Sequence, residues 1–177
     1  MKKLVLCAML LFGFSVMAMA QETPAFEIFG GYSYVRCDDS SWSSADCNLS
    51  GWDASLAANG NKWLGVVADV SGQYGSVSGA GVKLYSAMFG PRLTFRAKKF
   101  TPFIQGLFGA AHADIADGLE KDNMFAMAFG GGVDITIKGI FAVRPAQVEY
   151  FATRNGSDIL SHTRFSAGIV FKLGKRK

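Results

Sequence analysis

The sequence predicts an all-β fold, an eight-stranded antiparallel transmembrane β-barrel. Three observations support this prediction. Eight segments alternate between apolar and polar or small side chains, the period expected when successive side chains of a strand point to opposite faces. The links between these segments alternate between short and long. The polar faces hold a near-balanced set of acids and bases, and the apolar faces hold rows of aromatic residues.

The N-terminal residues have the organisation of a secretory signal. Lys2 and Lys3 give a positive start, residues 4–16 form a short apolar run, and residues 18–20 read Ala-Met-Ala, a small-x-small cleavage site. The apolar run is short for a membrane-spanning helix, which disfavours an uncleaved anchor. We therefore assign residues 1–20 to a signal peptide.

Residues 21–177 are expected to form one outer-membrane β-barrel domain. Removing Lys2 and Lys3 lowers the formal net charge from +4 to +2, so the basic pI does not indicate a nucleic-acid partner. No segment after the signal has about 18 uncharged apolar residues, which disfavours a helical span. The 21 glycines and only four prolines suit many short strands rather than disorder.

The two cysteines after the signal bracket a polar segment. Cys37 and Cys47 enclose residues 38–46. An exported pair meets an oxidising compartment, so we expect a disulfide that closes this loop. The alternative, a pair of metal-binding thiols, is weak without further cysteines or histidines nearby.

Four alternating segments occupy the first half of the chain, residues 25–35, 51–59, 63–75 and 84–96. Each has about nine to thirteen residues, enough for a tilted strand to cross a bilayer. In chain order their apolar faces include Phe26, Leu56, Val70 and Phe89. Their polar faces include, in the same order, Glu27, Asp53, Asp69 and Arg92.

The second half of the chain contains four more segments, residues 101–111, 124–137, 141–153 and 162–173. The first of these is irregular, because placing Gln105 inside also places Phe103 and Leu107 inside. The next has Phe129 and Val133 on its apolar face and Asp134 on the other.

The last two segments complete the barrel. Residues 141–153 change phase, since Arg144 and Glu149 have opposite parity. A β-bulge near Pro145 would return both side chains to the interior. In residues 162–173 Phe165, Ile169 and Phe171 share the apolar face, opposite Arg164 and Lys172.

The connections sort by length and by charge. Short links fall at residues 60–62, 97–100 and 138–140, and long ones at residues 36–50, 76–83, 112–123 and 154–161. Short turns at one rim and long loops at the other are typical of transmembrane barrels. The long loops carry mostly acids, whereas the short-turn rim and the C-terminal tail carry mostly lysine and arginine.

The aromatic and charged residues favour a barrel in lipid over a soluble one. Aromatic residues near segment ends are expected to form interfacial belts: Phe26, Tyr34, Trp52, Trp63, Tyr74, Tyr85, Phe95, Phe141, Phe151, Phe165 and Phe171. A soluble, lipocalin-like barrel would instead turn its apolar face inward and its charges to water. The polar faces predict an ion-pair network in the lumen, formed by Glu27, Asp53, Asp69, Arg92, Asp134, Arg144, Glu149, Arg164 and Lys172.

The chain resembles the small OmpA-like eight-stranded outer-membrane β-barrel proteins over residues 25–173. The resemblance rests on residues 26–34, Phe89-Gly90-Pro91-Arg92, Pro102-Phe103, residues 130–134 and residues 165–171. It implies location in the outer membrane of a bacterium after export through the periplasm, contact with outer-membrane lipids, and assembly by the outer-membrane insertion machinery. The family's last strand usually ends in an aromatic residue that this machinery reads, whereas here residues 174–177 follow the strand.

Three functions remain open. The first is a structural or surface-interaction role, with an extracellular partner binding the long loops. The second is a narrow porin-like channel, and the third is a lipid-modifying enzyme. For catalysis, Ser161 and His162 are adjacent in a strand and so point to opposite faces, which disfavours a Ser-His pair. We expect no enzyme activity, no cofactor and no metal, because the acidic segment 114–123 lacks the ligand spacing of an EF-hand.

Overall fold

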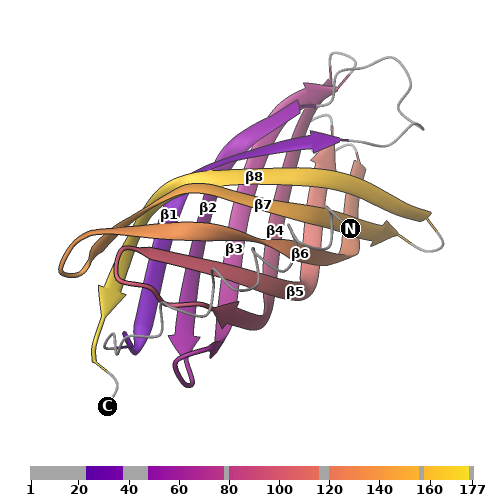
Figure 1. The fold of residues 1–177 in the computed structure, drawn as a ribbon. Coiled ribbons are helices and arrows are strands. Elements are labelled where there is room, and N and C mark those ends of the chain that lie inside the picture. Colours follow the sequence, from indigo (N-terminus) through magenta and orange to yellow (C-terminus); the bar gives the residue numbers. More distant parts are fainter. Residues whose placement is uncertain (1–22, 38–47, 78–79, 116–119, 156–157, 176–177) are drawn as a thin grey trace, which may run out of the picture.

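The eight predicted strands form one closed antiparallel barrel, in which each strand pairs with its sequence neighbours and the first pairs with the last (Figure 1). The computed structural model describes residues 23–37, 48–77, 80–115, 120–155 and 158–175. The strands are β1 (Phe26–Cys37), β2 (Asn48–Asn59), β3 (Leu64–Val77), β4 (Ala80–Thr94), β5 (Phe100–Ile115), β6 (Glu120–Lys138), β7 (Phe141–Asn155) and β8 (Asp158–Leu173). The predicted fold class is therefore confirmed. Within the described ranges, no helix is long and apolar enough to cross a membrane.

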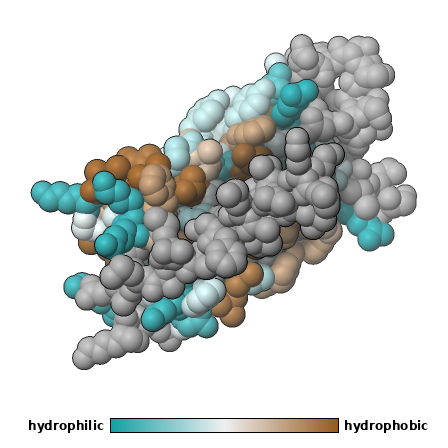
Figure 2. All heavy atoms as spheres, in the orientation of Figure 1, coloured by the Kyte–Doolittle hydropathy of each residue, from teal (hydrophilic) through white to brown (hydrophobic). Residues whose placement is uncertain are grey.

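The two faces of the barrel wall have the predicted chemistry. Phe89 and Ile169 are 56% and 50% exposed on the outside, whereas Asp69 and Arg92 are 1% exposed inside. Phe103 and Leu107 point inward beside Gln105, as the irregular pattern of β5 predicts. In the view of Figure 2, hydrophobic patches lie along the side of the barrel and hydrophilic residues lie toward its ends.

A bulge in β7 explains the phase change in its sequence. The pairing of β7 with β8 shifts register between Arg144 and Gln147, around Pro145. Arg144 and Glu149 are both fully buried, so the shift turns both side chains into the lumen despite their opposite parity. The predicted bulge is confirmed.

Three of the four predicted long loops are largely strand. β3 and β4 pair as far as Val77 and Ala80, β5 and β6 as far as Ile115 and Glu120, and β7 and β8 as far as Asn155 and Asp158. The prediction of loops at residues 76–83, 112–123 and 154–161 was therefore wrong in extent. Glycine, serine and charged residues are frequent in these segments, so their sequence shows little of the apolar alternation by which a strand is recognised. Between β1 and β2, residues 38–47 lie outside the described residues.

The aromatic residues predicted for the belts lie on the outside of the barrel, with the exception of Phe151. Outside the barrel, Trp63 packs on Phe95 with ring centroids 6.3 Å apart, Phe141 on Phe171 at 5.1 Å, and Tyr74 on Tyr85 at 5.8 Å. Phe151, predicted as a belt residue, is instead only 2% exposed and points inward. It follows the β7 bulge and shares the parity of Glu149, which also faces the lumen.

A charged network in the barrel lumen as the candidate functional site

Arg164 of β8 joins acids from two other strands near the middle of the lumen. Its Nη1 donates to Asp69 Oδ1 at 3.1 Å, across the barrel on β3. Its Nε donates to Glu149 Oε2 at 2.8 Å, and its Nη2 lies 2.6 Å from the same oxygen. Each of these three side chains is at most 1% exposed, so the charges are held by one another rather than by solvent.

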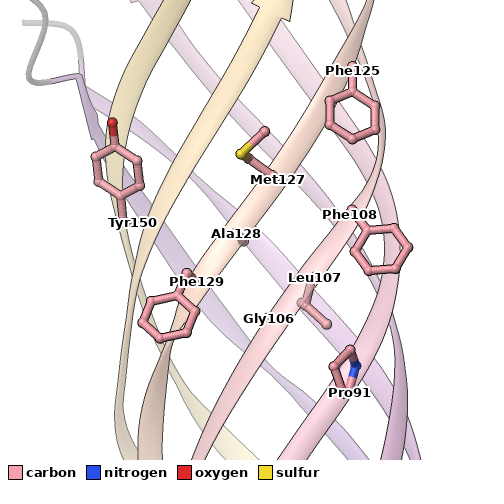
Figure 3. Close-up of a pocket in the computed structure, with 9 residues that line it drawn as sticks. All are labelled: Pro91, Gly106, Leu107, Phe108, Phe125, Met127, Ala128, Phe129 and Tyr150. Carbon is pink, nitrogen blue, oxygen red and sulfur yellow. The ribbon is translucent and has the colours of Figure 1, made fainter.

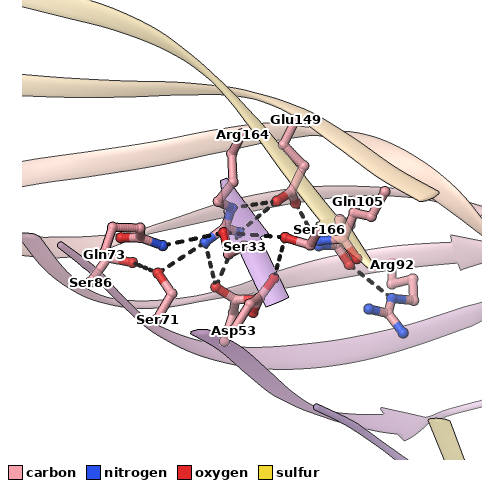
Figure 4. A network of polar contacts seen from close by, with 12 residues as sticks. Ser33, Asp53, Ser71, Gln73, Ser86, Arg92, Gln105, Glu149, Arg164 and Ser166 are labelled. Atoms are coloured by element: carbon pink, nitrogen blue, oxygen red, sulfur yellow. Dashed lines mark hydrogen bonds and ion pairs between the residues drawn. The ribbon is translucent and has the colours of Figure 1, made fainter. Parts of the chain in front are cut away.

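An amide connects this centre to a second group of charges. Gln105 Nε2 donates to Glu149 Oε1 at 2.7 Å, and its Oε1 accepts from Arg92 Nε at 2.9 Å (Figure 4). Arg92 Nη1 lies 3.8 Å from Glu27 Oε2, and Arg96 Nη1 donates to Glu27 Oε1 at 2.8 Å. Hydrogen bonds and ion pairs thus run without a break from the middle of the lumen to the rim with the short turns.

A further ion pair joins Arg144 of β7 to Asp134 of β6. Arg144 Nε and Nη2 donate to the two carboxylate oxygens of Asp134 at 2.7 and 3.1 Å, and its Nη1 donates to Gln147 at 2.7 Å. Its guanidinium lies between the rings of Phe29 and Phe103, 4.3 and 4.4 Å from their centroids. The flat guanidinium is well suited to such stacking, and this explains two large aromatic residues in a polar lumen.

The structure places all nine predicted network residues on the lumen side, and it brings seven of them into ion pairs. The other two have hydroxyl partners instead. Asp53 Oδ2 accepts from Ser166 at 2.7 Å, and Lys172 donates to Thr136 at 2.7 Å. The sequence predicts Arg96 on the short-turn rim. Arg92, Thr94 and Arg96 are alternate residues, however, so Arg96 continues the lumen-facing side of β4.

Toward the long hairpins, the lumen also holds many apolar side chains. The side chains there are buried and form one cluster that includes Val35, Leu49, Leu84, Leu107 and Phe151. Leu107 is predicted inside the barrel from the sequence, but the rest of this cluster is not. The sequence does contain an indication of the cluster: in β4, Leu84 and Met88 fall on the same face as Ser86 and Arg92, which is the lumen face. The lumen is therefore filled by two different kinds of contact along its length.

The side chains considered for catalysis lie on different faces. Ser161 Oγ is 2.5 Å from the hydroxyl of Tyr150, which is on the outside of the barrel. His162 instead lies against the ring of buried Phe151, with ring centroids 6.1 Å apart. His112 Nδ1 is 2.9 Å from Asn123 Oδ1 in an exposed pair. The structure therefore does not bring Ser161 and His162 together as a nucleophile and base.

The predicted Cys37–Cys47 disulfide and the predicted signal peptide fall outside the described side chains, and both stay predictions. Among the described residues, no group of three or more His, Cys, Asp or Glu side chains has the geometry of a metal site.

A shallow apolar groove lies on the outer wall of the barrel. It encloses about 490 Å³ over β4 to β7 (Figure 3). Phe108, Phe125, Met127 and Phe129 surround it, and Gly106 leaves space at its floor. Its lining suits hydrocarbon, as expected of a wall that faces acyl chains.

The closed barrel with an apolar exterior agrees with the fold that comparison with known proteins shows. The model of the outer membrane protein beta-barrel domain family matches residues 6–172. The chain belongs to this family. It is therefore a β-barrel of the bacterial outer membrane, in contact with its lipids. In such barrels the short turns face the periplasm and the long hairpins face outward.

Solved structures with the same fold support the assignment. Ail of Yersinia pestis is 19% identical, with a TM-score of 0.55, and the match covers 86% of this chain and 100% of Ail. Neisserial surface protein A is 14% identical, with a TM-score of 0.66, over 84% of this chain and 97% of that protein. The N-terminal barrel of Pseudomonas aeruginosa OprF is 12% identical, with a TM-score of 0.53, over 85% and 100%. No curated protein sequence matches the chain.

Proposed function

We propose that this barrel is a closed outer-membrane scaffold that presents its long hairpins at the cell surface. The observation that carries the proposal is the contact between Arg164 of β8 and Asp69 of β3, two strands on different sides of the barrel. Side chains that meet across the lumen narrow it at that level, and the three ion-paired side chains there are at most 1% exposed. The apolar cluster around Leu84 and Phe151 forms a second barrier nearer the outside.

The presented rim includes the segment between Cys37 and Cys47, which carries Asp38, Asp39 and Asp46. An acidic rim attracts basic surfaces through long-range electrostatics. The partner that suits this rim is therefore a protein or polymer with a basic surface. Before the barrel can bind a partner at the surface it must be assembled, and the partner for assembly is the outer-membrane insertion machinery.

A narrow channel is the second candidate function. The observation that favours it is that Arg164 is shared between Asp69 and Glu149, which lie on different strands. A guanidinium held by two acids can release one and keep the other, so a rearrangement could open a path for small ions. The first candidate is preferred because the apolar cluster must also part before ions can pass.

Conductance in a planar lipid bilayer separates the two functions. The scaffold predicts no stepwise current after insertion of the folded protein, whereas a large porin in the same bilayer gives defined steps. Steps of reproducible size that scale with salt concentration would favour the channel. Current that appears in Glu149→Gln, and not in the parent protein, would assign the barrier to the Arg164 ion pairs.

A variant lacking residues 39–46 serves as the matched control for the surface role. The deletion leaves β1 and β2 whole, so we expect the variant to fold and remain closed. Vesicles carrying it should bind less to a polylysine-coated surface than vesicles with the full chain, and the difference should shrink at high salt. Equal binding by both proteins would remove the segment from the proposed surface role.

A further inference from the structure

The buried charges of the lumen are not evenly distributed along its axis. Near the periplasmic rim lie four bases and two acids, which we call the periplasmic layer: Arg92, Arg96, Arg144, Lys172, Glu27 and Asp134. Nearer the middle lie one base and three acids: Arg164, Asp53, Asp69 and Glu149. The periplasmic layer therefore has a formal excess of two positive charges.

The buried polar atoms of the described residues that lack a hydrogen-bond partner follow the same division. Among these residues, donors lack partners near the periplasmic rim, and acceptors lack partners near the middle. In the periplasmic layer, the buried atoms without a hydrogen-bond partner among the described residues include Arg92 Nη2, Thr94 Oγ1, Arg96 Nε, Arg96 Nη2 and Thr101 Oγ1. Each of these can donate a hydrogen bond. Near the middle the corresponding atoms are the acceptors Asp53 Oδ1 and Asp69 Oδ2. Charge and unused donors thus indicate independently that the periplasmic layer attracts a negative group.

The unused donors lie close together. Arg92 and Arg96 reach the two oxygens of the same Glu27 carboxylate, at 3.8 and 2.8 Å. Thr94 lies between them on the lumen face of β4 and is 4% exposed. Thr101 faces Arg96 across the β4–β5 turn, because Phe95 N donates to Pro102 O and Ala97 N to Phe100 O. Thr101 itself is 1% exposed, and Arg92 is also 1% exposed.

We propose that the periplasmic layer binds a small inorganic anion, a halide or a phosphate-type oxyanion, that enters from the periplasm. Arg92 and Arg96 would donate charge-assisted hydrogen bonds, and the hydroxyls of Thr94 and Thr101 would complete the donor set. Glu27 contacts Nη1 of both Arg92 and Arg96, and Asp134 is paired with Arg144. The anion would therefore use the donors that these carboxylates leave unpaired, Nη2 of Arg92 and Nε and Nη2 of Arg96. The site is separate from the Arg164 centre and from the outer hairpins.

The first test is anion-dependent thermal stability of the folded protein in detergent. The unfolding midpoint is followed by gel mobility of unboiled samples, with chloride or phosphate replacing gluconate, a bulky anion, at constant ionic strength. We expect the midpoint to rise and then saturate with chloride, phosphate or both, because a ligand that binds only the folded state stabilises it. The responding anion identifies the ligand. No saturable rise with either one would overturn the proposal.

Matched threonine variants locate the effect. Thr101→Val removes one donor and keeps the shape, and it should raise the anion concentration at half-saturation roughly tenfold, since a hydrogen bond to a charged group is lost. Thr94→Val is expected to act in the same direction and serves if Thr101→Val does not fold. Thr153→Val makes the same change at another buried lumen position, on β7, and should leave the half-saturation unchanged. Equal half-saturation in all three variants and the parent would overturn the proposed location.

A direct test is anomalous diffraction from crystals soaked in bromide. The proposal predicts a bromide peak within hydrogen-bond distance of Arg92 Nη2 or Arg96, and its loss in Thr101→Val crystals soaked in the same way. Ordered water alone at that position, with bromide elsewhere or absent, would contradict a halide site. In that case the stability test with phosphate decides: a saturable rise of the unfolding midpoint indicates an oxyanion site, and no rise indicates that there is no anion site.

Discussion

Replacing Arg164 with methionine should lower the free energy of unfolding by about 3–5 kcal/mol, the loss typical when one partner of a buried ion pair is removed. Methionine fills similar space, so the loss measures charge rather than volume. Asp69 and Glu149 would both be left without their cation in the lumen. Urea unfolding of the barrel in lipid vesicles, followed by tryptophan fluorescence, gives the measurement.

A matched surface substitution and a compensated variant make this result interpretable. Arg154→Met, on the exposed outer face of β7, should change stability by less than about 1 kcal/mol. Adding Asp69→Asn and Glu149→Gln to Arg164→Met should restore part of the loss, because the uncompensated charges are then gone. An Arg164→Met barrel as stable as the parent would show that the lumen tolerates unpaired acids, against the structure.

The same reasoning ranks the other arginines. Replacing Arg92 should cost less than replacing Arg164, because Glu27 keeps Arg96 at 2.8 Å when Arg92 is removed. Arg164 has no such substitute among the described residues, since it is the only base paired with Asp69 and Glu149.

Gly168→Ala should prevent or severely weaken closure of the barrel. Gly168 and Gly31 face each other in the ladder between β8 and β1, the seam that closes the sheet. A Cβ at Gly168 would lie 2.3 Å from the carbonyl oxygen of Gly30, and one at Gly31 would lie 2.2 Å from that of Ala167. Both contacts are with backbone, so the strands themselves must separate. Overpacking of this kind costs about 1–3 kcal/mol or more.

Gly30→Ala is the control for the seam, because a Cβ at Gly30 meets no atom within 4 Å. We expect Gly30→Ala to fold like the parent and Gly168→Ala to lose most of the compact, unboiled gel band. Similar amounts of compact band in the two variants would refute the close approach of β1 and β8 at this position.

The faces of the strands were readable from the sequence because a barrel wall separates lipid from lumen at every second residue. This rule placed Asp69, Arg92 and Asp134 inside, and it exposed the bulge at Pro145 as a break in phase. Parity does not give the height of a side chain along the axis. The contact of Arg164 with Asp69, 95 residues away, depends on the tilt and stagger of all the intervening strands.

The errors have the same physical origin. Phe151 looked like an interface aromatic from its place near a strand end, yet its parity after the bulge puts it in the lumen. Arg96 looked like a turn residue, although it continues the inward series of Arg92 and Thr94 and reaches Glu27. The sequence predicts loops in place of the outer hairpins, because these segments show little apolar alternation. In each case the environment of the residue depends on its place in the three-dimensional fold. A local sequence pattern does not contain that information.

The most direct test of this account is spin-label accessibility in the folded barrel in bilayers, at Phe89 and Ile169 on the outside and at Val67 in the lumen. Labels at the two outer positions should collide readily with dissolved oxygen and rarely with a water-soluble nickel complex, as expected in hydrocarbon. The label at Val67, which is 0% exposed, should collide rarely with both. Free access of the nickel complex to residue 67, with oxygen excluded at residues 89 and 169, would contradict a lipid-facing wall around a packed, ion-paired interior.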